Sequence, residues 1–290
     1  MMNEQPKINL LLCDTFPGQL PPNIPSYASM FGDLFHSVSE SVVFEVFPVM
    51  KGVFPPKLNQ EELYLITGSN SSVYDKEPWI LELLQWIRNA ATLHIKLVGI
   101  CFGHQAIAQA LGGNVQRYAG GWGVGIRESF ILDGVMRPYF SDGYLRLLYN
   151  HHDQVSKLPA DAVIIAQSSF CQYEGFRIGN YILTFQGHPE YTPEYELYLL
   201  NNHAQHEDEE VKKEAVLSIK NLRHQGTVIA QFIIHFYHHE ECPVAKWENI
   251  LPLCNLYIPL SHTNPLPIHK IIGLEADRNV GYAEVTHARQ

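Results

Sequence analysis

The sequence has no apolar run long enough to cross a membrane. A membrane-spanning helix needs about 20 consecutive, predominantly apolar residues. Residues 1–7 are polar and lead directly into an apolar segment, which is not typical of a secretory signal peptide. We therefore expect a protein that is not associated with a membrane.

Cysteine is scarce and shows no pairing pattern. The 5 cysteines are widely spaced, and no two of them form a Cys-x-x-Cys motif. Such a set predicts neither a disulfide framework nor a zinc site. Free thiols are typical of a reducing compartment, so we expect a cytoplasmic protein. The positions are Cys13, Cys101, Cys171, Cys242 and Cys254.

Basic residues are outnumbered by acidic ones, 20 to 30, and the formal net charge is −10. Nonspecific binding to nucleic acid requires a basic surface, so we do not expect nucleic acid as a partner. The sequence contains no Gly-Lys-Ser/Thr phosphate loop. Its glycine-rich segment 120–125 neither follows a clear strand nor opens a clear helix. We expect a turn there and no phosphate site.

Apolar residues make up 46% of the 290 residues and charged residues 17%, which suffices for a sizeable core. Short apolar runs alternate with segments of helical spacing, and this pattern predicts an α/β fold with three layers, a mostly parallel sheet between helices on both faces. Strands are expected at 8–13, 42–46, 63–67, 96–100, 125–132, 163–167 and 181–186, with a hairpin or strand pair over 168–177. Helices are expected at 27–38, 78–91, 105–111, 194–204, from the acidic segment 206–210 to about 222, and from 226 to about 238.

The segment 96–105 joins an apolar strand to a run that can form a helix, and Cys101 stands at the junction between Gly99 and Gly103. A tight strand-to-helix turn lifts one side chain above the sheet as a nucleophile elbow. Glycines are needed there because a Cβ would block the turn or the close packing of helix on strand. The helix N-terminus favours a thiolate. We interpret Cys101 as a catalytic nucleophile.

Two motifs resemble the signatures of the class I glutamine amidotransferases. Residues 99–105 resemble the family's Gly-x-Cys-x-Gly-x-Gln motif, and residues 185–190 resemble the strand end that carries the His and Glu of a Cys-His-Glu triad. The resemblance implies that Cys101, His188 and Glu190 are catalytic. Because His188 and Glu190 are two apart, an extended segment would place both side chains on one side.

The resemblance also implies an oxyanion hole and a substrate pocket. Ser69 N–H, in the loop after the strand at 63–67, and Phe102 N–H would hold the developing oxyanion. Gly68 and Gln105 would belong to the pocket. The segment 150–155 resembles the loop that holds the glutamine α-amino and α-carboxyl groups, which assigns Asn150, His152 and Asp153 to substrate binding.

The implied chemistry needs neither a metal nor an organic cofactor. Adjacent His151 and His152 would point to opposite sides of an extended segment, and the histidines near 235–239 suit a helix C-terminus. We therefore expect no metal site.

The implied reaction is hydrolysis of a glutamine or γ-glutamyl amide bond through a γ-glutamyl thioester, carried by a domain at 1–238 with an extension of unknown role at 239–290. The chain resembles free-standing family members, such as a solitary glutaminase domain of the GMP-synthase type and the plant γ-glutamyl peptidases. Two enzyme interpretations stay open: a glutaminase that serves a separate synthetase subunit, and a stand-alone hydrolase of γ-glutamyl peptides. A third is a scaffold with the same fold and no catalysis.

Overall fold

The structure is a computed structural model that describes residues 5–16, 18, 20–202 and 208–238. The expected extension 239–290, with Cys242 and Cys254, lies outside the described residues. The strands are β1 (Lys7–Leu11), β2 (Val43–Phe47), β3 (Leu63–Ile66), β4 (Lys96–Ile100), β5 (Asn114–Arg117), β6 (Gly123–Ile131), β7 (Tyr144–His151), β8 (Asp153–Lys157), β9 (Val163–Gln167), β10 (Gly175–Ile178) and β11 (Ile182–Phe185).

A 9-stranded sheet in the order β2-β1-β3-β4-β11-β10-β9-β6-β7 forms the centre of the described residues, and β5 pairs with β8 apart from it. From β2 to β11 neighbouring strands run parallel, whereas from β11 to β7 they alternate in direction. The central parallel strands β3, β4 and β11 are short apolar runs because both of their faces are covered. The carboxyl ends of the parallel strands therefore meet at one edge.

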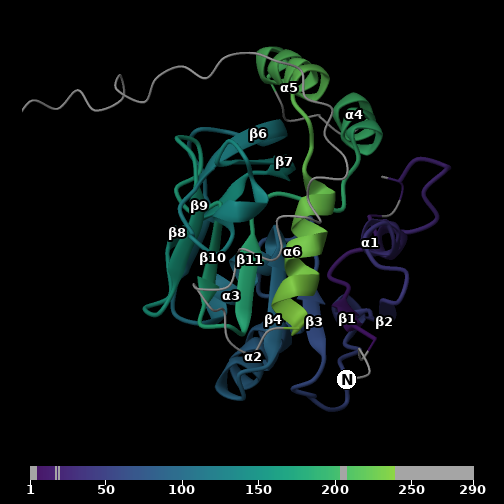
Figure 1. The fold of residues 1–290 in the computed structure, drawn as a ribbon, viewed down its shortest axis with the longest axis vertical. Coiled ribbons are helices and arrows are strands. Elements are labelled where there is room, and N and C mark those ends of the chain that lie inside the picture. Colours follow the sequence, from purple (N-terminus) through teal and green to yellow (C-terminus); the bar gives the residue numbers. More distant parts are fainter. Residues whose placement is uncertain (1–4, 17, 19, 203–207, 239–290) are drawn as a thin grey trace, which may run out of the picture. The chain divides into compact units, whose positions relative to one another are not determined.

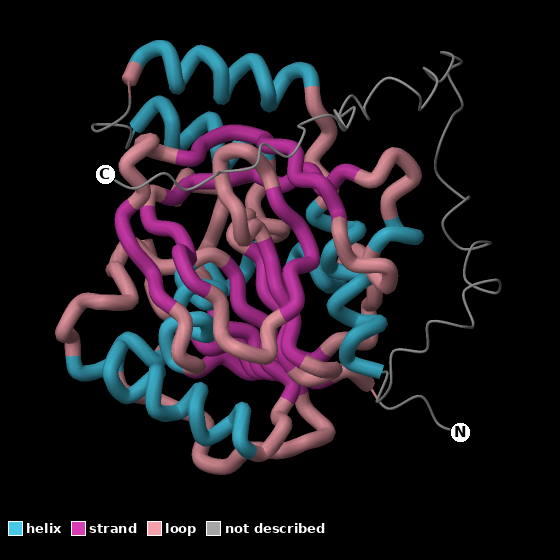
Figure 2. Tube along the Cα trace, turned by 90° about the vertical axis from the view of Figure 1, so that its left-hand side faces the viewer, coloured by secondary structure: helices cyan, strands magenta, loops and turns pink. Residues whose placement is uncertain are grey.

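The helices are α1 (Tyr27–His36), α2 (Pro78–Thr92), α3 (Phe102–Ala110), α4 (Pro193–Asn202), α5 (Glu209–Asn221) and α6 (Gly226–His238), with short 3-10 turns at Val49–Lys51 and Arg137–Tyr139. Helices α1 and α6 share one hydrophobic core with one face of the sheet, and α2 and α3 share a second core with the other face. Figure 1 shows α6 in front of the parallel strands and α2 and α3 behind them. In Figure 2 the strands lie between helices on either side. The three-layer α/β fold is confirmed.

Local sequence explains why two of these helices begin where they do. Ser26 caps α1, because its hydroxyl accepts the Ser29 N–H while the Ser29 side chain bonds back to the Ser26 backbone. Pro78 opens α2, where its missing N–H costs nothing. The buried side chains of α2 recur at helical spacing: Ile80, Leu83, Leu84, Ile87 and Ala90.

The antiparallel half of the sheet departs from the expected elements. Segment 150–155 is not a loop, because β7 extends to His151 and β8 starts at Asp153. Strand β7 pairs along its whole length with β6, so Asn150 lies opposite Val124. The alternation of apolar and polar side chains in Tyr144-Leu145-Arg146-Leu147 is the signal that predicts this strand.

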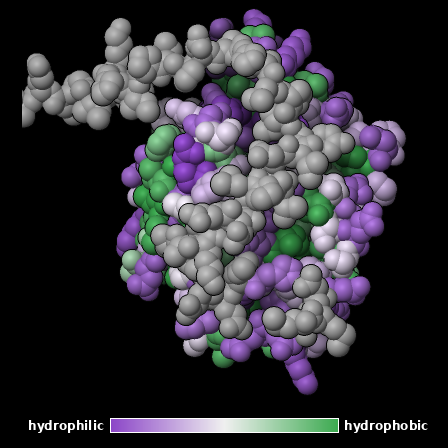
Figure 3. Space-filling view, in the orientation of Figure 1, coloured by the Kyte–Doolittle hydropathy of each residue, from purple (hydrophilic) through white to green (hydrophobic). Residues whose placement is uncertain are grey.

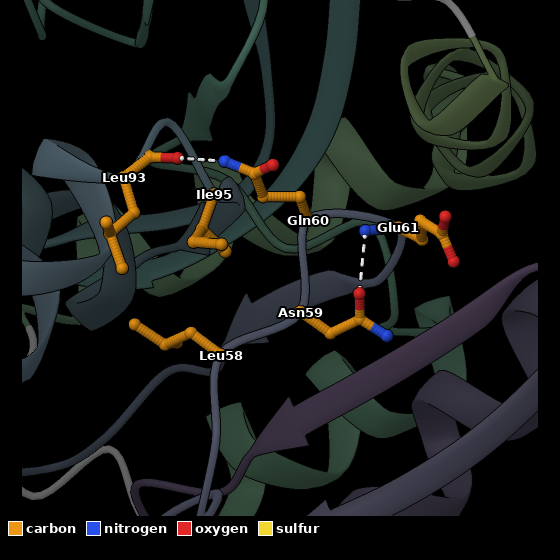
Figure 4. Close-up of a pocket in the computed structure, with 6 residues that line it drawn as sticks. All are labelled: Leu58, Asn59, Gln60, Glu61, Leu93 and Ile95. Atoms are coloured by element: carbon orange, nitrogen blue, oxygen red, sulfur yellow. Dashed lines mark hydrogen bonds between the residues drawn. The ribbon is translucent and has the colours of Figure 1, made fainter.

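Hydrophilic side chains are interspersed with smaller hydrophobic areas over the visible described part of the molecule (Figure 3). No helix among the described residues has the length and apolar character needed to cross a membrane. One shallow pocket is lined by Leu58, Asn59, Gln60, Glu61, Leu93 and Ile95 (Figure 4).

This pocket lies where the chain enters β3 and β4, at the sheet edge opposite their carboxyl ends. Its polar groups bond to one another. Gln60 Nε2 donates to Leu93 O over 3.0 Å, and Glu61 N–H donates to Asn59 Oδ1 over 3.1 Å. The bond from Gln60 to Leu93 thus connects the two turns that line the pocket. The lining residues include no pair of a nucleophile and a base.

Candidate active site

Cys101 occupies a strained turn between β4 and α3. Its backbone has φ 52° and ψ −104°, a left-handed conformation that side-chain-bearing residues rarely adopt. The Cys101 N–H donates to Phe185 O of β11 over 2.9 Å, which holds the turn against the neighbouring strand. The thiol lies at the N-terminus of α3, where the helix dipole favours negative charge. This is the geometry of a nucleophile elbow.

The two flanking glycines are required for steric reasons, as expected. A Cβ on Gly99 would lie 2.6 Å from the Gly103 carbonyl carbon. A Cβ on Gly103 would overlap the Ile66 carbonyl oxygen of β3. Helix α3 therefore packs against the strands at a distance that only glycine permits.

His188 and Glu190 follow β11 and are both buried. Glu190 Oε1 lies 2.7 Å from His188 Nδ1. The His188 N–H donates to Leu148 O over 2.8 Å, and the Tyr191 ring stacks on the imidazole with centroids 3.9 Å apart. The ring is therefore held through its backbone N–H, by stacking on one face and through Nδ1.

The charges around His188 favour its protonated form. Burial opposes protonation, but the electrostatic interactions with Glu190 and Cys101 prevail and raise the pKa of His188 to about 10. The surroundings of Gly68 show how close His188, Tyr27 and Cys101 lie to one another. A Cβ on Gly68 would lie 2.9 Å from His188 Cε1, 3.0 Å from the Tyr27 hydroxyl and 3.7 Å from Cys101 Cβ.

A chain of side-chain amides leads to the thiol. Gln186 Nε2 lies 3.6 Å from Cys101 Sγ, within reach for a donor to sulfur. Gln105 Nε2 donates to Gln186 Oε1 over 3.2 Å and to the Asp153 carbonyl over 2.8 Å. Because Gln186 accepts through its oxygen, its NH₂ group faces the sulfur, where it can stabilise a thiolate.

The model of the glutamine amidotransferase class-I family matches residues 40–205, more than half of the chain. This chain belongs to the class I glutamine amidotransferase family. It is 33% identical over 201 residues to γ-glutamyl peptidase 2 of Arabidopsis thaliana, covering 67% of this chain and 79% of the relative.

One further relative and one solved structure are also similar to this chain. A Saccharomyces cerevisiae protein whose name places it among the glutamine amidotransferases is 40% identical over 162 residues, covering 53% of this chain and 64% of the relative. The crystal structure of a glutamine amidotransferase from Thermotoga maritima superposes with a TM-score of 0.63 at 18% identity, covering 81% of this chain and 99% of that one. This structural likeness shows the fold.

Hydrogen bonds fix the loop that follows β3. The Gly68 N–H donates to the Tyr27 hydroxyl, and the Asn70 N–H donates to Asp14 Oδ2. The Ser71 N–H donates to Ser69 Oγ, and the Ser72 N–H donates to Asp75 Oδ2. Four of the five backbone N–H groups in residues 68–72 thus have an acceptor. The N–H of Ser69 has none among the described residues.

The three residues of segment 150–155 that were expected to bind substrate contact different parts of the structure. Asp153 uses both carboxylate oxygens, which accept from the Ser72 hydroxyl over 2.6 Å and the Tyr74 hydroxyl over 3.0 Å. Its side chain therefore clamps the loop after β3. His152 accepts from Arg117 Nε through Nε2, and Asn150 is half-buried within the β6–β7 pairing. Substrate binding by Asn150, His152 and Asp153 stays a prediction.

The sequence did not single out Tyr27, Asp14 or Gln186. Gln186 lies inside the second signature, next to the residues assigned there. Tyr27 and Asp14 have no local signal, because their contacts with Glu190 and Asn70 join distant parts of the chain. Among the described residues, no group of three or more His, Cys, Asp and Glu side chains is arranged to hold a metal ion.

Proposed function

We propose that this protein is a cysteine hydrolase that cleaves the γ-glutamyl amide bond of small γ-glutamyl peptides through a γ-glutamyl thioester. The observation that carries the proposal is Cys101 on its strained elbow beside the buried His188–Glu190 pair. A nucleophile, a base near it and a group that orients the base are the components of acyl transfer by covalent catalysis. The similarity to proteins named γ-glutamyl peptidases supports the peptide as substrate.

The first half-reaction forms the thioester. The Cys101 thiolate attacks the γ-carbonyl carbon, and the C=O electron pair moves onto oxygen. When that pair returns, the C–N bond breaks, and His188 gives its Nε2 proton to the leaving amine. The raised pKa of His188 supports an imidazolium in the resting enzyme, which can act as this acid.

The second half-reaction releases glutamate. A water molecule gives a proton to His188 Nε2 as it attacks the thioester carbon, and the C–S bond then breaks to restore the thiolate. Glu190 keeps the Nδ1 proton on the imidazole throughout, because its Oε1 accepts there. We assign the oxyanion to the N–H groups of Ser69 and Phe102. The unoccupied N–H of Ser69 supports this role, as does the place of Phe102 at the first turn of α3, where backbone N–H groups lack helical acceptors.

The decisive test is glutamate release by the purified protein from glutamine and from a panel of γ-glutamyl dipeptides, with Cys101→Ala as control. Turnover of a peptide that exceeds that of glutamine and disappears in Cys101→Ala supports the proposal. Strong turnover of glutamine alone, or turnover that appears only with a synthetase added, would favour a glutaminase subunit. Equal cellular function of the wild type and Cys101→Ala would favour a scaffold.

A further inference from the structure

Tyr27 is the first residue of α1, and its side chain extends from that helix into the interior beside the active site. Only 1% of the residue is exposed. Its ring packs edge-on against Phe16 and Phe31, with centroids 4.5 and 5.4 Å away. The phenol oxygen is thus held in place by aromatic packing on two sides.

This hydroxyl makes one hydrogen bond as a donor and one as an acceptor. It donates to Glu190 Oε1 over 2.7 Å and accepts from the Gly68 N–H over 3.2 Å. Glu190 Oε1 is also the oxygen that accepts from His188 Nδ1. Glu190 Oε2 has no partner in the described residues. Both hydrogen bonds that hold the carboxylate therefore meet at one oxygen.

We propose that Tyr27 is a positioning residue that fixes the Glu190 carboxylate and the Gly68–Ser69 backbone relative to each other. The role rests on the proposed function, because it links the group that orients His188 to the loop assigned to the oxyanion. Acyl transfer needs both at the same time: the base must reach the thiol and the leaving group, and a donor must face the new oxyanion.

The chemistry of a buried phenol suits this role. Burial, reinforced by the charge of Glu190, raises the pKa of Tyr27 well above its ordinary value, so the hydroxyl keeps its proton and donates it to the carboxylate. Its lone pair is then available to the Gly68 N–H. With Gly68 N–H turned toward Tyr27, the next N–H along the chain, that of Ser69, is left without an acceptor.

The test compares Tyr27→Phe with Tyr64→Phe. Tyr64 is also only 1% exposed, and its hydroxyl also makes two bonds, donating to Lys57 O and accepting from the Asn59 N–H. That hydroxyl is partly buried and points to the sheet edge opposite Cys101. Both substitutions keep the ring and remove one donor and one acceptor bond. We expect Tyr27→Phe to lower kcat for a γ-glutamyl dipeptide between about 10- and 100-fold, with KM within about twofold. Tyr64→Phe should keep both constants.

A second measurement does not depend on the substrate. The rate at which iodoacetamide alkylates Cys101 is followed against pH, because this reaction reports the thiolate and its imidazolium partner. We expect the profile of Tyr27→Phe to be displaced from that of the wild type, and the profile of Tyr64→Phe to coincide with it. If the wild type cleaves no γ-glutamyl compound, the proposed function fails while this measurement still tests Tyr27. Wild-type kcat and an unchanged alkylation profile in Tyr27→Phe would overturn the inference, as would equal losses in both variants.

Discussion

The side-chain amide of Gln186 faces the sulfur of Cys101, with Nε2 and Sγ 3.6 Å apart. Gln186 is fully buried, and its oxygen accepts from Gln105, which fixes the amide orientation. A donor at this distance stabilises the thiolate more than the thiol, because hydrogen bonds to the charged form favour that form. The second signature thus contributes a thiolate donor in addition to His188 and Glu190.

Replacing Gln186 by Met should therefore weaken the nucleophile while keeping the size of the side chain. We expect Cys101 to be alkylated by iodoacetamide between about 10- and 100-fold more slowly at pH 7, since one hydrogen bond to a charged group is worth about 1.5–3 kcal/mol. Gln109→Met is a suitable control, because Gln109 lies on α3, the helix that follows Cys101, and its side-chain oxygen accepts from the Val115 N–H away from the thiol. Alkylation at the wild-type rate in Gln186→Met would contradict the assignment.

Gly68 lies against His188, Tyr27 and Cys101, and these neighbours leave no room for a methyl group on its Cα. In Gly68→Ala we expect kcat to fall by about 100-fold or more, because the new Cβ must displace the imidazole or the phenol. The backbone at Gly68 is not left-handed, so alanine brings no dihedral strain there. Circular dichroism should accordingly show a folded protein, and steady-state kinetics should show the loss.

Gly32→Ala gives the matched control for that substitution. Gly32 lies within α1, and a Cβ there would meet nothing within 4 Å. Alanine should keep kcat and raise the free energy of unfolding by about 0.5–1 kcal/mol, since glycine is the poorer helix former. Comparable kinetic loss in both variants would show that the Gly68 result is not due to its place in the site.

The raised pKa of His188 also predicts how stability depends on pH. The pKa is about 10 in the folded protein and about 6.5 in an unfolded chain. Between these values the folded state binds the additional proton, so the contribution of His188 is complete below pH 6.5 and is lost as the pH rises toward 10. Urea denaturation should show the wild type losing stability over this window relative to Glu190→Gln, which lacks the carboxylate charge that raises the pKa.

The sequence predicts those parts of the site whose residues lie close together in the chain, and it misses those formed by distant residues. The elbow at Cys101 is local: an apolar strand, two glycines and a helix former stand side by side in the chain. The His188–Glu190 contact is also local, because alternation on an extended segment brings residues two apart to one side. The bond from Tyr27 to Glu190 spans 163 residues and exists only once α1 packs on the sheet.

The prediction of a loop at 150–155 was wrong for a related reason. The family resemblance favoured a loop, but β6 offers a paired edge along the whole of β7, and the backbone groups of Asn150 gain partners there. The carboxylate of Asp153 then bonds to Ser72, 81 residues away. Neither the pairing nor this clamp could be read from residues 150–155 alone, because both depend on segments that arrive from elsewhere in the fold.

A buried carboxyl beside the active-site strands gives the last prediction. Glu174 is 1% exposed, and its Oε1 accepts from the Ser168 hydroxyl over 2.6 Å. Burial raises the pKa of Glu174 from 4.5 to about 7. The folded protein therefore holds a proton that the unfolded chain has released, and it loses stability as the pH rises from 4.5 through 7.

Glu174→Gln keeps the shape and the acceptor oxygen but cannot ionise. The variant should gain stability relative to the wild type as the pH rises from 5 to 8, by a difference on the order of 3 kcal/mol at most. Urea denaturation of both proteins across this range measures it, and activity at pH 6 serves to verify that the site is intact. Wild-type and variant stability curves that run parallel from pH 5 to 8 would show that Glu174 does not change its charge in the folded protein over this range.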